Sequence, residues 1–310
     1  MQKIILAILV IILSVVLFNR FGLDNNGFDL SNASVDTDLI LSGGPAKDGI
    51  PSIDNPKFIV SKAVDYLDAS DRILGLNYQG VVKAYPIKIL NFHEIVNDDF
   101  DGQPIAITYC PLCNSGIAYL SNINGNKLSF GVSGLLYNSD VLLYDRETNS
   151  LWSQIMSTAI SGPLIGHRLK LVSLSHTSWQ NWQQRHPESL VLSTDTGYSR
   201  DYTHNPYAGY ELDSSVWFPL VAQDDSRHPK ALIISIEIDG KFKAYPFSEL
   251  EQLEGDLNDN VAGKELIIRY SKQYKSASIS DAQGNELPTV TSFWFAWVAF
   301  HPNDIVFSLD

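Results

Sequence analysis

Both cysteines of this 310-residue chain lie in one short stretch, ITYCPLCNSG, which runs from Ile107 to Gly116. Two residues separate Cys110 from Cys113, a spacing that can present two thiolates to one metal ion or form a redox-active pair. A disulfide between them would close a very small loop and would constrain the unfolded chain little. The pair therefore indicates chemistry rather than a structural crosslink.

The segment that contains the cysteines belongs to an internal sequence repeat. The segment ILGLNYQGVVKAYPIKIL (73–90) matches IISIEIDGKFKAYPFSEL (233–250) at an offset of 160, the difference between Gly240 and Gly80. After one inserted residue, GQPIAITYC (102–110) matches GKELIIRYS (263–271). Each copy has the pattern of two strands, a helix beginning after a proline, a loop and another strand. We therefore expect an α+β fold, predominantly β, with two strand-helix-strand modules at about 73–120 and 233–280 around a β-rich middle segment.

Comparison of the two copies adds a histidine to the cysteine pair. Ser271 and Tyr274 stand where the first copy has its cysteines, and Leu253 stands where it has His93. Positions 87, 90 and 93 share one face at helical spacing, so His93 replaces a core leucine. The repeat does not need these three polar groups in both copies, which favours a functional site. The alternative is a hydrogen-bonded core histidine beside two small buried thiols.

We interpret the site as a metal centre with Cys110, Cys113 and His93 as ligands. His301, at the end of the aromatic run FWFAWVAFHPND (293–304), is the candidate fourth ligand, and Met156 is another if the ion is copper. Two thiolates and an imidazole suit zinc or copper. We expect no nucleotide cofactor.

Two other functions remain open, and so does the question of whether the protein is an enzyme. The first is a thiol-disulfide oxidoreductase. Against a thioredoxin-like fold, the sequence after Cys113 contains NING between short apolar runs, which predicts a hairpin where a helix would be needed. The second is a glycan- or protein-binding scaffold with structural cysteines. It would use the Tyr-rich segment from Thr196 to Lys230, which shows no period and is typical of a long functional loop. No hydrolase motif is present.

The N-terminus predicts export. Lys3 precedes an apolar run from Ile4 to Phe18, which we interpret as a signal peptide or, because no cleavage site follows closely, a retained membrane anchor. We expect residues 1–23 to be this segment, residues 24–55 a spacer and residues 56–310 a single exported domain. That domain would face the periplasm or the extracellular side, or be secreted if the signal is cleaved. The net charge of −13 makes nucleic acid an unsuitable partner.

One further helix can be placed. SWQNWQQRHP (178–187) predicts a short helix capped by Ser178, with Trp179 and Trp182 facing the core and Pro187 after its end.

Five segments in order resemble the prokaryotic family catalogued as domain of unknown function 3179. They are KAYPIKILNFHEIVND, ITYCPLCNSG, FGVSGLLYNSDVLLYDRETNSLWSQ, SGPLIGHRLKL and FWFAWVAFHP. The resemblance spans roughly residues 55–305 and implies a family rather than an activity. Its matching positions are His93, Glu94, Asp98, Cys110, Cys113, Asn138, Asp140, Asp145, Arg146, Trp152, Gln154 and His301. We interpret Asp140, Asp145 and Arg146 as a strand-turn ion pair rather than as catalytic groups.

Overall fold

The computed structural model describes residues 25–309, which are mostly β, with 40% strand and 11% helix. The predicted N-terminal signal or anchor, residues 1–23, lies outside the described residues. In the part of the chain that is described, no helix is both long enough and apolar enough to cross a membrane.

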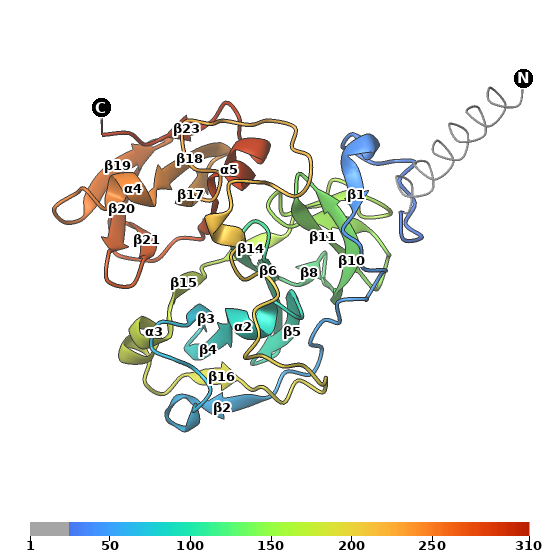
Figure 1. The fold of residues 1–310 in the computed structure, drawn as a ribbon, viewed down its shortest axis with the longest axis horizontal. Helices are drawn as coiled ribbons and strands as arrows, with labels where there is room; N and C mark the ends of the chain where they lie inside the picture. Colours follow the sequence, from blue (N-terminus) through green and yellow to red (C-terminus); the bar gives the residue numbers. More distant parts are fainter. Residues whose placement is uncertain (1–24, 310) are drawn as a thin grey trace, which may run out of the picture.

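Five sheets and one small hairpin make up the described chain. Their arrangement is that of a five-bladed β-propeller (Figure 1). The first sheet has the order β1 (Ile40–Ser42), β10 (Phe130–Tyr137), β11 (Asp140–Asp145), β12 (Leu151–Ser153) and β13 (Thr158–Ser161). The second has β14 (Lys170–Val172), β7 (Ser115–Leu120), β6 (Gln103–Cys110) and β5 (Ile95–Phe100). The third has β15 (Ser175–Ser178), β3 (Arg72–Tyr78), β4 (Val81–Pro86), β16 (Leu190–Leu192) and β2 (Phe58–Val60).

The C-terminal part supplies the other two sheets. One has the order β22 (Val290–Phe293), β17 (Leu232–Ile238), β18 (Lys241–Pro246) and β23 (Ile305–Val306). The other has β19 (Leu257–Val261), β20 (Lys264–Ser271) and β21 (Ser276–Asp281). The small hairpin pairs β8 (Asn122–Ile123) with β9 (Asn126–Lys127), as the Asn-Gly signal predicted. Asn124 and Gly125 both have positive φ, which a two-residue turn of this kind requires.

The helices are short and connect or cover the sheets. They are α2 (Ile87–Leu90), α3 (Trp179–Arg185), α4 (Phe247–Leu250), α5 (Trp294–Phe300) and the 3₁₀ turns η1 (Thr37–Leu39), η2 (Ser61–Ala63) and η3 (Tyr210–Leu212). The predicted helix after Ser178 is confirmed. The Ser178 side chain accepts a hydrogen bond from the backbone N–H of Asn181, and Trp179 and Trp182 are buried.

The prediction of an α+β fold with two strand-helix-strand modules is wrong. The expected helices α2 and α4 are single turns of four residues each. The strands before and after each turn belong to different sheets, so no such module forms. A proline start and three apolar positions at helical spacing fit one turn as well as a longer helix. After α2 the chain leaves the helical region at Glu94, whose φ of 57° ends the turn.

The repeated KAYP segments have one interaction in common. In the first, the Lys83 ammonium lies 2.9 Å from the nearer carboxylate oxygen of Asp98, and the Tyr85 hydroxyl donates to the same carboxylate at 2.5 Å. The equivalent lysine, tyrosine and aspartate of the second segment are Lys243, Tyr245 and Asp259. Each cluster ties a β-hairpin to the first strand of the following sheet, which gives the repeated Lys and Tyr a structural role.

Residues 25–55, predicted as a spacer, are part of the folded structure. Strand β1 pairs with β10 in register Ile40↔Tyr137, and Phe28 and Ile40 are buried against that sheet. Few residues of this polar segment are apolar, but their burial is enough to hold it against the sheet. The pairing of β1 with β10 adds hydrogen bonds for its backbone N–H and C=O groups.

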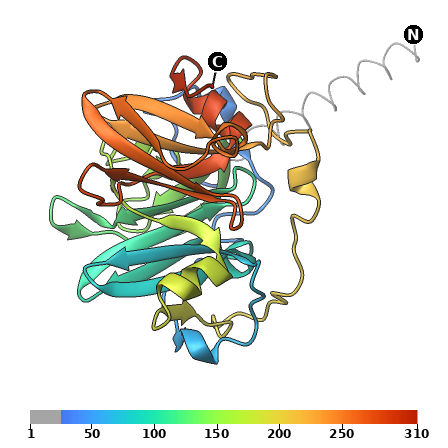
Figure 2. The same cartoon turned by 90° about the vertical axis from the view of Figure 1, so that its left-hand side faces the viewer.

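The segment from Thr196 to Lys230 has no regular structure apart from η3, as its sequence predicted. Figure 2 shows it running along one side of the molecule, from the part that contains α3 to the C-terminal sheets. Tyr202 and Tyr210 anchor it, since both are buried.

Candidate functional site

The cysteines occupy the turn of the β6–β7 hairpin. Cys110 ends β6 and pairs with Ser115 at the start of β7, and Cys113 lies in the turn between them. Asn114 closes the turn with a φ of 50°. The backbone N–H of Phe293 donates to the Cys113 carbonyl at 2.8 Å, which ties the turn to the start of α5. Both thiols are buried, with residue exposures of 1% and 0%.

A second hairpin turn meets the cysteine turn. Asn138 and Ser139 connect β10 to β11, and both have positive φ (54° and 66°), as a two-residue hairpin turn of type I′ requires. The Asn138 side chain fixes the turn on two sides, because it donates to the Ala299 carbonyl and accepts from the Val221 N–H. Asp140 follows directly, and its side chain is fully buried.

The two turns bring together two thiols and a carboxylate. Cys110 Sγ, Cys113 Sγ and one Asp140 oxygen all lie within 4.8 Å of one another. Both thiols donate to the Ser139 carbonyl, at 3.8 Å and 3.4 Å. Asp140 Oδ2 accepts from the Ile155 N–H at 3.0 Å, whereas Oδ1 is buried without a hydrogen-bond partner. Burying a carboxylate oxygen without a hydrogen bond or a cation destabilises the folded state. This oxygen therefore indicates a ligand, such as a metal ion, that the site would bind.

Burial also changes the protonation of the cluster. It raises the pKa of the Asp140 carboxyl to about 7, and the backbone N–H groups of Ile155 and Val141 oppose that rise only in part. It raises the pKa of the Cys113 thiol far above its ordinary value, with further contributions from Cys110 and Asp140. Without a cation, the cluster therefore holds protons at neutral pH. A bound cation would reverse this preference.

A cavity of about 150 Å³ opens next to Cys110. Its walls are mostly apolar, and three aromatic residues of the 196–230 segment, Tyr207, Trp217 and Phe218, cover it. Glu94 is the one carboxylate among its lining residues and is itself buried. Burial raises the pKa of Glu94 to about 8, and the Asp140 charge adds to that rise.

His93 does not join the cysteines. Its Nδ1 lies 2.7 Å from the Pro51 carbonyl, and its Nε2 lies 2.7 Å from the Tyr202 hydroxyl. Burial lowers the pKa of His93, which favours the neutral ring. The helical spacing that placed it in the core was informative. Its partners are a proline carbonyl and the long loop, however, rather than the cysteine turn.

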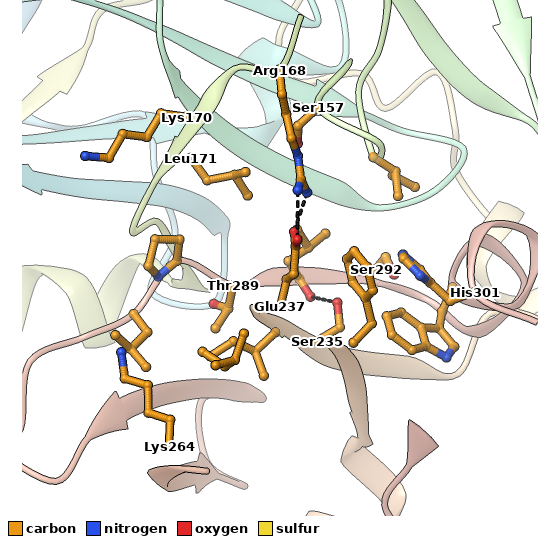
Figure 3. Close-up of a pocket in the computed structure, with 18 residues that line it drawn as sticks. Ser157, Arg168, Lys170, Leu171, Ser235, Glu237, Lys264, Thr289, Ser292 and His301 are labelled. Atoms are coloured by element: carbon orange, nitrogen blue, oxygen red, sulfur yellow. Dashed lines mark hydrogen bonds and ion pairs between the residues drawn. The ribbon is translucent and has the colours of Figure 1, made fainter. Parts of the chain in front are cut away.

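His301 also lies elsewhere, beside a larger cavity of about 340 Å³. Its ring stacks on Trp297 at 4.2 Å between centroids, and its Nδ1 is 2.9 Å from an Asp304 oxygen. Figure 3 shows that the centre of this cavity holds a bidentate ion pair between Arg168 and Glu237. The two charges of this pair neutralise each other. None of the residues Cys110, Cys113 and Asp140 lines this cavity.

The predicted ion pair among Asp140, Asp145 and Arg146 is not formed. Asp145 instead accepts hydrogen bonds from Trp152 Nε1 at 2.8 Å and from the Thr148 backbone N–H at 2.6 Å. Arg146 pairs with Asp54 and Asp48. Asp140 lies at the opposite end of β11 from Asp145, which frees it for the cysteines.

Sequence reasoning missed Asp140 as a candidate ligand and Glu94 as a neighbour of the site. Both were among the positions marked by the family resemblance. Asp140 also shows a local signal, since it opens the apolar strand VLLY directly after an Asn-Ser turn. Its distance of 27 positions from Cys113 (140 − 113) concealed the contact.

The described chain is therefore a mostly β protein with a buried thiol-carboxylate cluster between two hairpin turns. The model of the family described as "Protein of unknown function (DUF3179)" matches residues 47–304. The chain belongs to this family, as its sequence motifs indicated. No curated protein and no solved structure matches it.

Proposed function

We propose that this protein binds one Zn²⁺ ion through Cys110, Cys113 and Asp140. One observation carries the proposal: three ligand atoms from two separate hairpins converge within 4.8 Å in a buried position. The Asp140 oxygen left without a partner gives the cluster an unused electron pair. Thiolate and carboxylate oxygen are both zinc ligands.

The ligand set favours zinc over copper(I). Copper(I) prefers soft sulfur ligands, and a carboxylate suits it poorly. Met156, the sulfur ligand considered for copper, packs in the separate apolar cluster around Phe28 and Ile40. Two thiolates with one carboxylate would give a site of net charge −1 with Zn²⁺, compared with −2 for a monovalent ion, and burial penalises the larger charge.

The position of the cavity supports a catalytic rather than a purely structural metal site. Structural zinc sites usually have four protein ligands, whereas catalytic ones keep a position for water or substrate. Here there are three candidate protein ligands, and one of them, Cys110, lines a cavity together with Glu94. We assign Glu94 the role of proton acceptor for a metal-bound water, because a bound cation would favour the ionised form of a carboxyl whose pKa burial raises. When bound, zinc would supply Lewis acidity and make such a water more acidic.

The redox alternative is supported less well. The sulfurs are close enough to form a disulfide after small movements, but both cysteines are buried. Burial and a neighbouring carboxylate raise the pKa of the Cys113 thiol, whereas reactive cysteines need it lowered.

Elemental analysis of the full-length chain, purified in detergent without chelators, tests the metal site. We expect about one zinc per chain in the wild type. The Cys110→Ser/Cys113→Ser double variant should lose it, and Asp140→Asn should bind zinc at least about tenfold more weakly. Asp145→Asn is the matched control, because Asp145 is an equally buried carboxylate on the same strand. Zinc-free wild type that takes up no added zinc would refute the proposal, as would unchanged affinity in Asp140→Asn.

The Glu94→Gln variant tests whether Glu94 is a proton acceptor or a metal ligand. It should keep the zinc, because Glu94 lies outside the set of three converging ligand atoms. Loss of the metal in this variant would make Glu94 a fourth ligand and would close the site to water.

We also propose that the chain is exported and held in the membrane by its N-terminal segment. Support comes from the apolar run between Ile4 and Phe18 that follows Lys3. Protease added to spheroplasts should digest the folded domain, and a carbonate wash should leave the chain in the membrane fraction. A shortened soluble chain would show that the segment is cleaved, and full protection from protease would refute export.

A further inference from the structure

A second cavity, of about 250 Å³, also borders the cysteine turn, through Tyr109, Pro111 and Asn114. It shares Pro111 and Tyr207 with the cavity at Cys110 but has a different chemical character. Its lining includes one guanidinium, that of Arg72, three asparagine side chains and several aromatic rings.

Arg72 is a fixed cation without a counter-charge in contact. Its two terminal nitrogens donate to the carbonyls of Tyr274 at 2.7 Å and His176 at 3.0 Å. It makes no ion pair with any carboxylate of the described chain. Burial lowers the pKa of Arg72 to about 10, as expected for a charge taken out of water. Two of its five N–H donors are used, which leaves three for a ligand.

Two amide groups add donors to the same cavity. Asn114 Oδ1 accepts from the Tyr109 hydroxyl at 2.9 Å, so the Asn114 NH₂ group has no protein partner among the described residues. Asn205 Oδ1 accepts from Asn91 at 3.3 Å and from the Tyr207 backbone N–H at 2.9 Å, and its NH₂ group is likewise unpaired within the described chain. Donors exceed acceptors here, which suits a ligand that carries oxygen acceptors.

Aromatic rings form a large part of the remaining walls, together with Ile87 and Pro111. Tyr109, Tyr207, Tyr210 and Phe293 all line the cavity. Rings of this kind stack on flat or ring-shaped ligands. Glu211, on η3, also borders the cavity, but it is exposed to solvent and influences Arg72 only from a distance.

We propose that this cavity binds a small ring-bearing carboxylate, with its carboxylate on Arg72 and its ring against the tyrosines. A single guanidinium matches the one charge of a carboxylate better than the two charges of a phosphate. Two kinds of molecule share this chemistry, an aromatic acid and a sugar acid. The unpaired asparagine donors would meet the hydroxyls of the second. The recognition does not require the proposed zinc ion.

Calorimetric titration of the full-length chain with paired probes tests the proposal. Benzoate is compared with benzyl alcohol, glucuronate with glucose, and inorganic phosphate serves as an anion without a ring. At least one carboxylate should bind tenfold or more tightly than its neutral partner. Preference for benzoate would identify an aromatic acid and preference for glucuronate a sugar acid. Equal binding of charged and neutral partners, no binding of any carboxylate, or tighter binding of phosphate would overturn the proposal.

Two variants locate the effect. Arg72→Gln should abolish the preference for the charged probe, and a preference that survives in a folded variant would overturn the assignment. Glu211→Gln removes an exposed negative charge near the guanidinium and should strengthen carboxylate binding twofold or more. Because this change lies on the surface, it tests the proposal even if Arg72→Gln fails to fold. Repeating the titration on the Cys110→Ser/Cys113→Ser variant separates the result from that for zinc, since carboxylate binding should persist there.

Discussion

The substitution Asp140→Asn should have opposite effects on the metal-free and metal-loaded protein. In the metal-free chain, Asp140 is a buried carboxylate with one oxygen unpaired, and burial raises its pKa from 3.8 to about 7. Its ionisation therefore opposes folding. Replacing it with a neutral amide removes this opposition but also removes a metal ligand.

The magnitude follows from the pKa difference. The folded state holds the proton more tightly than the unfolded state, so stability falls as pH rises from about 4 to about 7. Each pH unit in that window costs about 1.4 kcal/mol, and roughly three units give about 4 kcal/mol. Below pH 4 both states are protonated and the two proteins should be similar in stability. Above pH 7 the metal-free Asp140→Asn variant should be more stable than the metal-free wild type by about 4 kcal/mol.

Urea unfolding at intervals of half a pH unit between pH 4 and 8, in the presence of a chelator, measures this difference. Adding zinc at pH 7.5 should then reverse the order, because only the wild type gains the full binding energy. Asp145→Asn is the control. Asp145 accepts bonds from Trp152 and Thr148, so losing its charge should destabilise by about 1–3 kcal/mol. A metal-free Asp140→Asn protein that is less stable than wild type across this range would refute the reasoning.

Three further predictions concern the framework around the site. Asp98→Ala should destabilise by about 3–5 kcal/mol because it leaves the buried lysine of its cluster unpaired. Asp259→Ala should cost less, since the side chains of that ion pair are 15% and 18% exposed, compared with 9% and 5%; equal costs in urea unfolding would contradict this. His93→Gln and His301→Gln should each leave the zinc content unchanged by elemental analysis, and a loss of zinc in either would mean that the ligand set is incorrect. Ser178→Ala should lower stability by about 1 kcal/mol through loss of a helix cap, and an unchanged unfolding curve would exclude that role.

Local features of the fold could be predicted from the sequence because local interactions determine them. The Asn124–Gly125 hairpin and the helix capped by Ser178 follow from turn chemistry and capping, which need no distant partner. The overall fold class could not be predicted from the sequence. A short apolar period after Pro86 is compatible with one helical turn or several, and the assignment of strands to sheets depends on contacts far apart in the chain.

The site was predictable only in part for a similar reason. Both thiols belong to one turn, so their spacing alone indicated a common role. The carboxylate arrives from another hairpin, and its approach depends on how two sheets pack. His93 was correctly placed in the core, but its partners, Pro51 and Tyr202, come from segments without any pattern. Periodicity specifies which side of an element is buried and says nothing about what lies opposite.

The two repeats suggest how a framework of this kind can carry chemistry at one place only. The β6–β7 and β20–β21 hairpins have matching registers, Cys110↔Ser115 and Ser271↔Ser276. The first turn carries the thiols to Asp140. The second turn supplies the Tyr274 carbonyl that holds Arg72. Equivalent turns thus support neighbouring cavities by different means, one through side chains and the other through its backbone. A backbone carbonyl does not depend on residue type, so the second turn can hold Arg72 without cysteines, whereas the first cannot form the cluster without them.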